Sequence, residues 1–160
     1  MPLRLIDPAD LDALSRAALT NPRRRQNLNL QADCADPCQR LFNAVGPENY
    51  IRPHRHTDPP KPECFVAMRG RFQLRLIDDG GKVTERFDLA PDGPVVAIDL
   101  PADVWQTILA LDPGRLVFET KPGPYVAMVD QDFAPWAPAE GSPEVMTYLT
   151  RLRDARFAGA

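Results

Sequence analysis

Proline is the feature that most restricts what this sequence can fold into. The chain has 18 prolines among 160 residues, or about 11%, whereas ~5% is typical. Because proline lacks a backbone N–H and disrupts the interior of a helix, long helices are excluded from most of the chain. Clusters of Gly, Pro and Asp mark turns at short intervals. The sequence therefore predicts an all-β fold made of short strands joined by turns.

Short runs with β-type alternation recur between residues 26 and 129. The candidate strands are residues 26–30, 39–45, 50–56, 63–68, 72–78, 82–88, 95–100, 105–111 and 116–120. Strong turn signals separate them, including Asp79-Gly80-Gly81 and the Pro-rich segment 58–62. Since no helical segment lies between these runs, we expect one antiparallel sandwich or barrel.

A helix is predicted at each end of this barrel. Asp7 is a suitable N-cap and Pro8 fits the first helical position, which indicates a helix over about residues 8–20. Ser142 is expected to cap the second helix, so that a loop and helix over about residues 130–157 complete a single domain of residues 1–160. The apolar residues of this second helix are expected to pack against the barrel, and they are Val145, Met146, Leu149 and Leu152. The loop 125–138 before it is expected to cover one mouth of the barrel.

Charge and composition argue against several classes of protein. Nineteen basic and 22 acidic residues give a net charge of −3, which disfavours non-specific binding of nucleic acid. No apolar run approaches the ~20 residues that span a bilayer, and the first ten residues lack a signal-peptide pattern. We therefore expect a cytoplasmic protein without a membrane partner. The three cysteines form no C-x-x-C pair and are expected to be reduced thiols.

The chain has only two histidines, His54 and His56. Two residues apart on a strand, they share a face at a separation of about 6.5–7 Å, so both imidazoles can reach one ion. Arg52 and Tyr50 are expected on the same face. If the turn 58–62 reverses the chain, Glu63 opens the neighbouring strand beside His56. Two histidines and one carboxylate suit Fe, Mn, Ni or Zn and leave positions open for water or substrate.

The spacing His54-Arg55-His56, six residues, Glu63, six residues, Gly70 resembles the first motif of the cupin superfamily. The runs YIRPHRH (50–56), FETKPGPY (118–125) and DFAPWAPAE (132–140) narrow this resemblance to the WbuC-type cupin-fold metalloproteins. The resemblance extends from about Arg23 to the final helix. It implies a cupin-type double-stranded β-helix (jelly-roll) barrel with short terminal helices, a metal site inside, and a homodimer. Relatives are often associated with bacterial surface-polysaccharide genes.

The sequence departs from this family at the metal site. The second cupin motif has Pro-x-Gly, two residues, then His, whereas this chain has Asp103 in place of the glycine and Gln106 in place of the histidine. Gln is a weaker, neutral oxygen donor. Two roles remain open for Gln106: a fourth ligand or holder of a water molecule, and a polar residue of the barrel interior that bonds to Glu63.

Five further residues are candidates for substrate binding: Arg52, Arg40, Glu119, Lys121 and Tyr125. Arg52 is expected in the cavity, either binding an anionic group of a substrate or pairing with Glu119. Arg40 would add positive potential. Glu119 and Lys121 either contact substrate or form an ion pair at the rim, and Tyr125 is either a substrate contact or a packed aromatic residue.

Three functional hypotheses follow. The first is a metal-binding cupin of unassigned reaction that acts on a small anionic or sugar-related metabolite, with isomerase, epimerase, lyase and oxygenase chemistry all open. The second is a non-catalytic cupin that binds a small ligand beside a degenerate metal site. The third is a structural dimer that exchanges the segment around Arg23–Arg25. The small-molecule ligand and the divalent metal distinguish the first hypothesis from the third.

Overall fold

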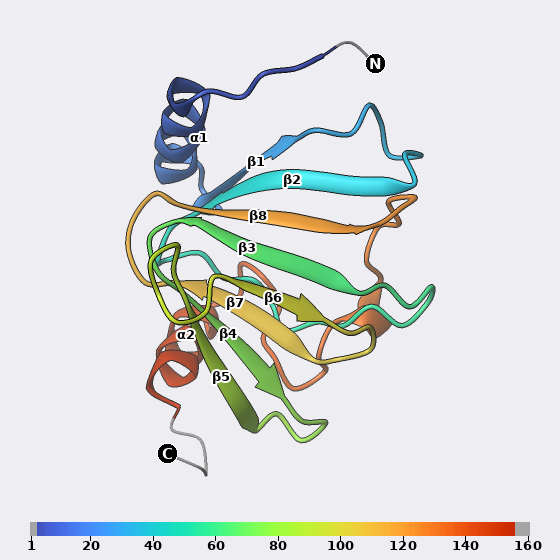
Figure 1. Cartoon of the computed structure of the whole chain (residues 1–160). Coiled ribbons are helices and arrows are strands. Elements are labelled where there is room, and N and C mark those ends of the chain that lie inside the picture. Colours follow the sequence, from blue (N-terminus) through green and yellow to red (C-terminus); the bar gives the residue numbers. More distant parts are fainter. Residues whose placement is uncertain (1–2, 156–160) are drawn as a thin grey trace.

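The computed structural model describes residues 3–155, which form two antiparallel sheets and two helices (Figure 1). The elements are α1 (Pro8–Thr20), β1 (Arg25–Asn29), β2 (Cys38–Val45), β3 (Glu63–Arg69), β4 (Phe72–Ile77), β5 (Val83–Leu89), β6 (Ala97–Leu100), β7 (Gln106–Ala110), β8 (Arg115–Pro122), the 3₁₀ helix η1 (Asp130–Asp132) and α2 (Val145–Asp154). One sheet has the strand order β1-β2-β8-β3-β6, and the other has the order β5-β4-β7.

The two sheets face each other and enclose the main apolar core. Phe65 on β3 and Val117 on β8 pack against Phe72 and Leu74 on β4 and Ile108 on β7. Each strand therefore contributes alternate side chains to the interior, as the β-type alternation in the sequence predicts. The predicted all-β jelly roll is confirmed.

One predicted strand, 50–56, is wrong. This segment is extended, but it forms only isolated bridges, from His54 to Gln106 and to Phe133. His54 exchanges two backbone hydrogen bonds with Gln106, at 3.1 and 2.9 Å. Pro53 precedes it and has no N–H to donate, which interrupts a regular ladder. The segment nevertheless lies along the start of β7, and this places His54 beside Gln106.

Helix α1 covers the outer face of the five-stranded sheet. Asp7 caps it, since its side chain accepts from the Asp10 backbone N–H while the Asp10 side chain accepts from the Asp7 backbone N–H. Leu14 and Ala18 pack on Ala44 of β2. Helix α1 thus lies on the side of this sheet that faces away from the barrel interior.

Helix α2 starts later than the sequence predicts. Ser142 is not its cap: its carbonyl accepts from the Val145 N–H in a preceding turn, and the helix begins at Val145. Leu149 and Leu152 are buried in a second apolar core, but Met146 is 55% exposed and does not pack against the barrel. The predicted end near residue 157 lies outside the described residues.

Arg75 joins the three-stranded sheet to the end of α2. Its side chain is inaccessible to solvent, and it donates to the carbonyls of Arg153 and Ala155 and to the Gln73 side chain. These carbonyls lie at the C-terminal end of α2, where the helix itself supplies no donors. Neither helix within residues 3–155 is long and apolar enough to cross a membrane.

Candidate metal centre

Two neighbouring segments of the chain bring three candidate ligands together. His54 and His56 come from the extended segment before β3, and Glu63 is the first residue of β3. The intervening loop reverses the chain, with a bridge between Thr57 and Pro60. Single ligand atoms of His54, His56 and Glu63 all lie within 4.8 Å of one another. That spacing is compatible with three bonds of about 2 Å to one ion.

His54 presents an unprotonated nitrogen to this centre. Its Nδ1 lies 2.9 Å from the Arg52 carbonyl oxygen, an acceptor, so Nδ1 carries the proton and Nε2 carries the lone pair. Burial lowers the pKa of His54 from 6.5, although the charge of Glu63 acts in the opposite direction. A neutral imidazole fixed by a backbone carbonyl is a typical metal ligand.

Glu63 is ionised and hydrogen-bonds to several neighbouring side chains. The residue is 3% exposed, and its Oε1 lies 3.2 Å from His56 Nε2 and 2.9 Å from Lys121 Nζ. Burial alone would raise the pKa of Glu63, but the hydrogen bond from His56 and the charge of Lys121 lower it to about 2. The carboxylate therefore provides a fixed negative charge between the two histidines and the lysine.

Gln106, the first residue of β7, closes the remaining side of the centre. Its Nε2 lies 2.9 Å from His54 Nε2 and 3.0 Å from Glu63 Oε2, while its Oε1 is buried without a hydrogen-bond partner. Rotation of the amide would exchange the two atoms and turn Oε1 toward His54 and Glu63. Those groups would repel an oxygen unless a cation lay between them. The residues present thus fit a divalent ion, with Oε1 as a further oxygen ligand.

Lys121 on β8 links Glu63 to Glu119. Its Nζ lies 2.8 Å from Glu119 Oε1, so the predicted ion pair between Glu119 and Lys121 is present. Burial would lower the pKa of Lys121, but the charges of the two carboxylates raise it. Burial raises the pKa of Glu119, which Lys121 partly offsets. The ammonium is therefore charged and neutralises part of the negative charge that a metal ion would meet.

A cavity of about 560 Å³ opens beside these residues. Arg52 lines it, stacks 5.2 Å from the Phe133 ring centroid, and donates to the Ala134 carbonyl at 2.9 Å. Its Nε is buried without a partner, and none of the carboxylates in the described chain pairs with it. The alternative pairing of Arg52 with Glu119 is therefore wrong. Arg52 remains the cation of this cavity that lacks a counterion.

Three predicted placements need correction. Arg40 lies outside the cavity, because it alternates with inward-facing Gln39 and Leu41, and it pairs with Asp36 at 3.2 Å. Tyr50 does not share the histidine face, since it packs in the second apolar core and donates to the Pro138 carbonyl. Tyr125 lines the cavity but is 53% exposed, so it is not a packed aromatic residue.

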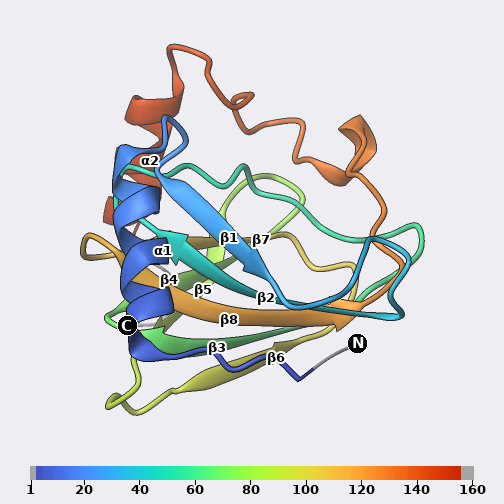
Figure 2. The same ribbon diagram turned by 90° about the horizontal axis from the view of Figure 1, so that it is seen from above.

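Sequence reasoning singled out residues 23–25 only as a segment exchanged between two subunits, and it missed that Arg23 and Arg25 line the cavity and pair with Glu140. Arg23 binds Glu140 through two nitrogens at 2.5 and 2.6 Å, and Arg25 contacts the same carboxylate at 3.3 Å. All three residues line the cavity. The loop between β8 and α2, orange to red in Figure 2, therefore borders the cavity as predicted and is tied there to the start of β1. No local pattern indicates a pair separated by more than a hundred residues.

The metal-free protein is expected to lose stability on acidification in two stages. The unfolded chain binds a proton at His54 near pH 6.5, whereas the folded chain does so only at lower pH, so stability falls below pH 6.5. Glu63 adds a second loss between pH 4.5 and about 2, worth ~3 kcal/mol in full. The raised pKa of Glu119 acts at higher pH than this second loss, because the folded chain gains stability as Glu119 takes up a proton above pH 4.5, which opposes part of the first loss.

Urea unfolding at about pH 7, 5.5, 4 and 2 measures both stages through the free energy of unfolding. The His54→Gln variant should lose the first stage, because its amide does not titrate. The same pH dependence from pH 7 to 5.5 in the wild type and in His54→Gln would contradict the neutral, buried state of His54.

Comparison with known proteins places the fold. A family model described as a domain of unknown function (DUF6016) matches residues 6–89, which include His54, His56 and Glu63 but not Gln106 or Lys121. No curated protein matches the chain.

Solved structures with a similar fold come from several bacteria. KdgF from Halomonas sp. is 18% identical, with a TM-score of 0.50 over 67% of this chain and 85% of that chain. SPY1581 from Streptococcus pyogenes, a protein of unknown function, is 11% identical, with a TM-score of 0.53 over 79% and 92%. TT1209 from Thermus thermophilus is 18% identical, with a TM-score of 0.50 over 71% and 93%. At these identities the likeness shows the fold alone, which is the cupin jelly roll.

Proposed function

Because the chain belongs to the DUF6016 family, whose description assigns no activity, we propose its function from its own residues. It is a metal-binding cupin that acts on a small anionic or sugar-related metabolite in the cavity beside β3, β7 and β8. The convergence of His54, His56 and Glu63 within 4.8 Å is the observation that supports this proposal most strongly. The buried, unpartnered Oε1 of Gln106 beside the same atoms adds to it.

The protein's own groups have separate roles in this proposal. His54, His56 and Glu63 would hold the ion, with Gln106 as a further oxygen ligand. Fe, Mn, Ni or Zn bound there supplies a Lewis acid. Arg52 binds the negative group of the metabolite, because its guanidinium lines the cavity without a counterion. Glu119, Lys121 and Tyr125 border the same space and are the further contacts for the metabolite.

One observation favours a second candidate function, a non-catalytic cupin that binds a small ligand. In the present arrangement Gln106 donates to both His54 and Glu63, and Lys121 neutralises Glu63, so the polar centre is satisfied without an ion. The cavity and Arg52 serve a bound ligand equally well in that case. Metal content separates the two functions.

Protein purified without a His-tag and without added metal is expected to contain close to one divalent ion per chain. Elemental analysis by plasma mass spectrometry gives both identity and stoichiometry. Addition of the missing ion should raise the melting temperature, since an ion that binds only the folded state stabilises it. A metal-free protein whose melting temperature does not respond to Fe, Mn, Ni or Zn would support the second function instead.

The Gln106→His variant should bind Zn or Ni about tenfold more tightly, equivalent to ~1.4 kcal/mol, because an imidazole replaces a neutral amide oxygen. Competition with a chromophoric chelator measures the dissociation constant. An unchanged constant would mean that the side chain at 106 does not reach the ion.

A specific relationship to the WbuC-type cupins belongs to the same proposal. It rests on the runs 50–56, 118–125 and 132–140. The homodimer and the cytoplasmic location are proposals on the same footing, and the dimer is testable by sedimentation equilibrium.

A further inference from the structure

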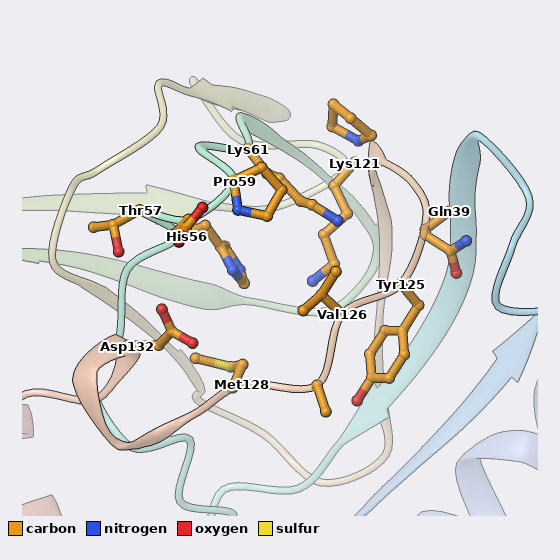
Figure 3. A pocket seen from close by; sticks show the side chains of 13 residues that line it. Gln39, His56, Thr57, Pro59, Lys61, Lys121, Tyr125, Val126, Met128 and Asp132 are labelled. Atoms are coloured by element: carbon orange, nitrogen blue, oxygen red, sulfur yellow. The ribbon is translucent and has the colours of Figure 1, made fainter.

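A second, smaller chamber is lined by His56 and shares several lining residues with the cavity described above. Its volume is about 90 Å³, and it is more enclosed than the main cavity. Figure 3 shows the side chains around it, which include His56, Lys61, Lys121, Tyr125, Met128 and Asp132. Lys121, Tyr125, Ala127 and Met128 also border the main cavity, so these residues form the partition between the two spaces.

Lysine is uncommon in this chain, and two lysines line the chamber. The sequence has only three lysines, Lys61, Lys82 and Lys121, among 19 basic residues. Two of the three line the chamber, whereas Lys82 is exposed beside the start of β5. A lysine ammonium is a compact point charge, while an arginine guanidinium is a wide planar fork. Two ammonium groups therefore suit a space that is too small for a drug-sized ligand.

Lys61 is a buried cation without a counterion. The residue is 7% exposed, and its Nζ donates to the Pro124 carbonyl. Within residues 3–155 no carboxylate lies within ion-pair distance of this ammonium. Two of its three N–H donors are left for another partner. Buried charges are usually paired, and burial together with Lys121 lowers the pKa of Lys61.

None of the acidic side chains near the chamber, within residues 3–155, forms an ion pair with Lys61. Asp132 lies across the chamber from Lys61 in Figure 3, and its Oδ2 accepts from the Val129 N–H at 2.8 Å. Asp58 is exposed. Glu63 and Glu119 are both bound to Lys121, which has one donor left.

We propose that this chamber binds a small planar oxyanion, a carboxylate such as formate or acetate or the bicarbonate ion, between Lys61 and Lys121. Its volume of about 90 Å³ is well below the ~300 Å³ or more of a typical ligand pocket, which suits an anion of three or four heavy atoms better than a sugar. Lys61 supplies the charge that is not otherwise compensated, and Lys121 completes the pair from the partition. The site adjoins the metal centre, since His56 lines the chamber and Lys121 binds Glu63, but Lys61 makes no hydrogen bond to a candidate ligand.

The test uses the full chain labelled only at lysine with ¹⁵N and ¹³C, so that three side-chain signals report on three known positions. Formate, acetate and bicarbonate are added separately at constant ionic strength. The Lys61 and Lys121 signals should shift and saturate, while the Lys82 signal stays in place. The anion that saturates at the lowest concentration identifies the preferred class.

Two variants make the test specific. Lys61→Met should weaken binding by about tenfold or more, since a hydrogen bond to a charged group contributes ~1.5–3 kcal/mol. Lys82→Met is the matched control and should leave the affinity unchanged. Shifts that are linear in concentration and similar for all three lysines, or no shifts in the wild-type protein, would overturn the proposal.

The same titration separates this inference from the proposed metal function. Anion binding should persist in protein stripped with a chelator and in the His54→Ala variant, because neither treatment removes Lys61 or Lys121. Loss of binding in both would mean that the anion sits on the metal and not in the chamber, which would also overturn the proposal.

Discussion

Replacement of His54 by alanine is expected to weaken divalent-metal binding about 100-fold or more, which corresponds to at least ~2.8 kcal/mol. The reason is the orientation of its imidazole: Nδ1 donates to the Arg52 carbonyl, so Nε2 points its lone pair at the centre without rearrangement. Removal of a fixed ligand loses both the bond and the preorganisation that the backbone provides. Chelator competition with Zn, Ni, Mn and Fe(II) measures the change.

The matched control is Asn43→Ala, which removes a buried polar side chain from the same cavity without removing a candidate ligand. Its metal affinity should equal that of the wild type. Equal affinities in His54→Ala and wild type would mean that the ion binds elsewhere, for example at the exposed thiols of Cys34 and Cys38.

The second large effect concerns stability and does not need a metal. Glu63→Ala should lower the free energy of unfolding by about 3–5 kcal/mol, because it leaves the Lys121 ammonium buried with only Glu119 as a carboxylate partner. Urea unfolding of chelator-treated protein measures this change. Part of the loss comes from Lys121 itself, so the double variant Glu63→Ala/Lys121→Met should be more stable than the sum of the two single losses predicts.

Strict additivity in this double-mutant cycle would show that the two side chains do not interact in solution. Lys82→Met is a suitable control in the same cycle, because Lys82 is exposed and distant in the sequence from Glu63. Its effect should add to that of Glu63→Ala without a coupling energy.

Most strands could be predicted because residues next to each strand, such as turn clusters, determine where it begins and ends. Turn clusters such as Asp79-Gly80-Gly81 fix where β4 ends and β5 begins, and Asp7 with Pro8 fixes the start of α1. The errors have a different origin. The segment 50–56 has the alternation of a strand, but Pro53 and its position between β7 and η1 allow only single bridges. Alternation reports which side chains share a face and not whether a partner strand is available.

The candidate site also has parts that the sequence predicts and parts that depend on how the strands pair. The approach of His54, His56 and Glu63 follows from a two-residue spacing and one chain reversal, both of which are visible in the sequence. The binding of Glu63 by Lys121 was not predictable, because the two residues meet only when β8 pairs with β3. The outward position of Arg40 likewise depends on which face of β2 turns toward α1.

The most direct measurement is anomalous X-ray diffraction from crystals of the protein grown with Mn or Zn. We expect a single strong peak about 2 Å from His54 Nε2, from His56 and from the Glu63 carboxylate, with the Gln106 amide oxygen turned toward it. Density in which these side chains remain bonded to one another, with the peak absent or at another site, would contradict it.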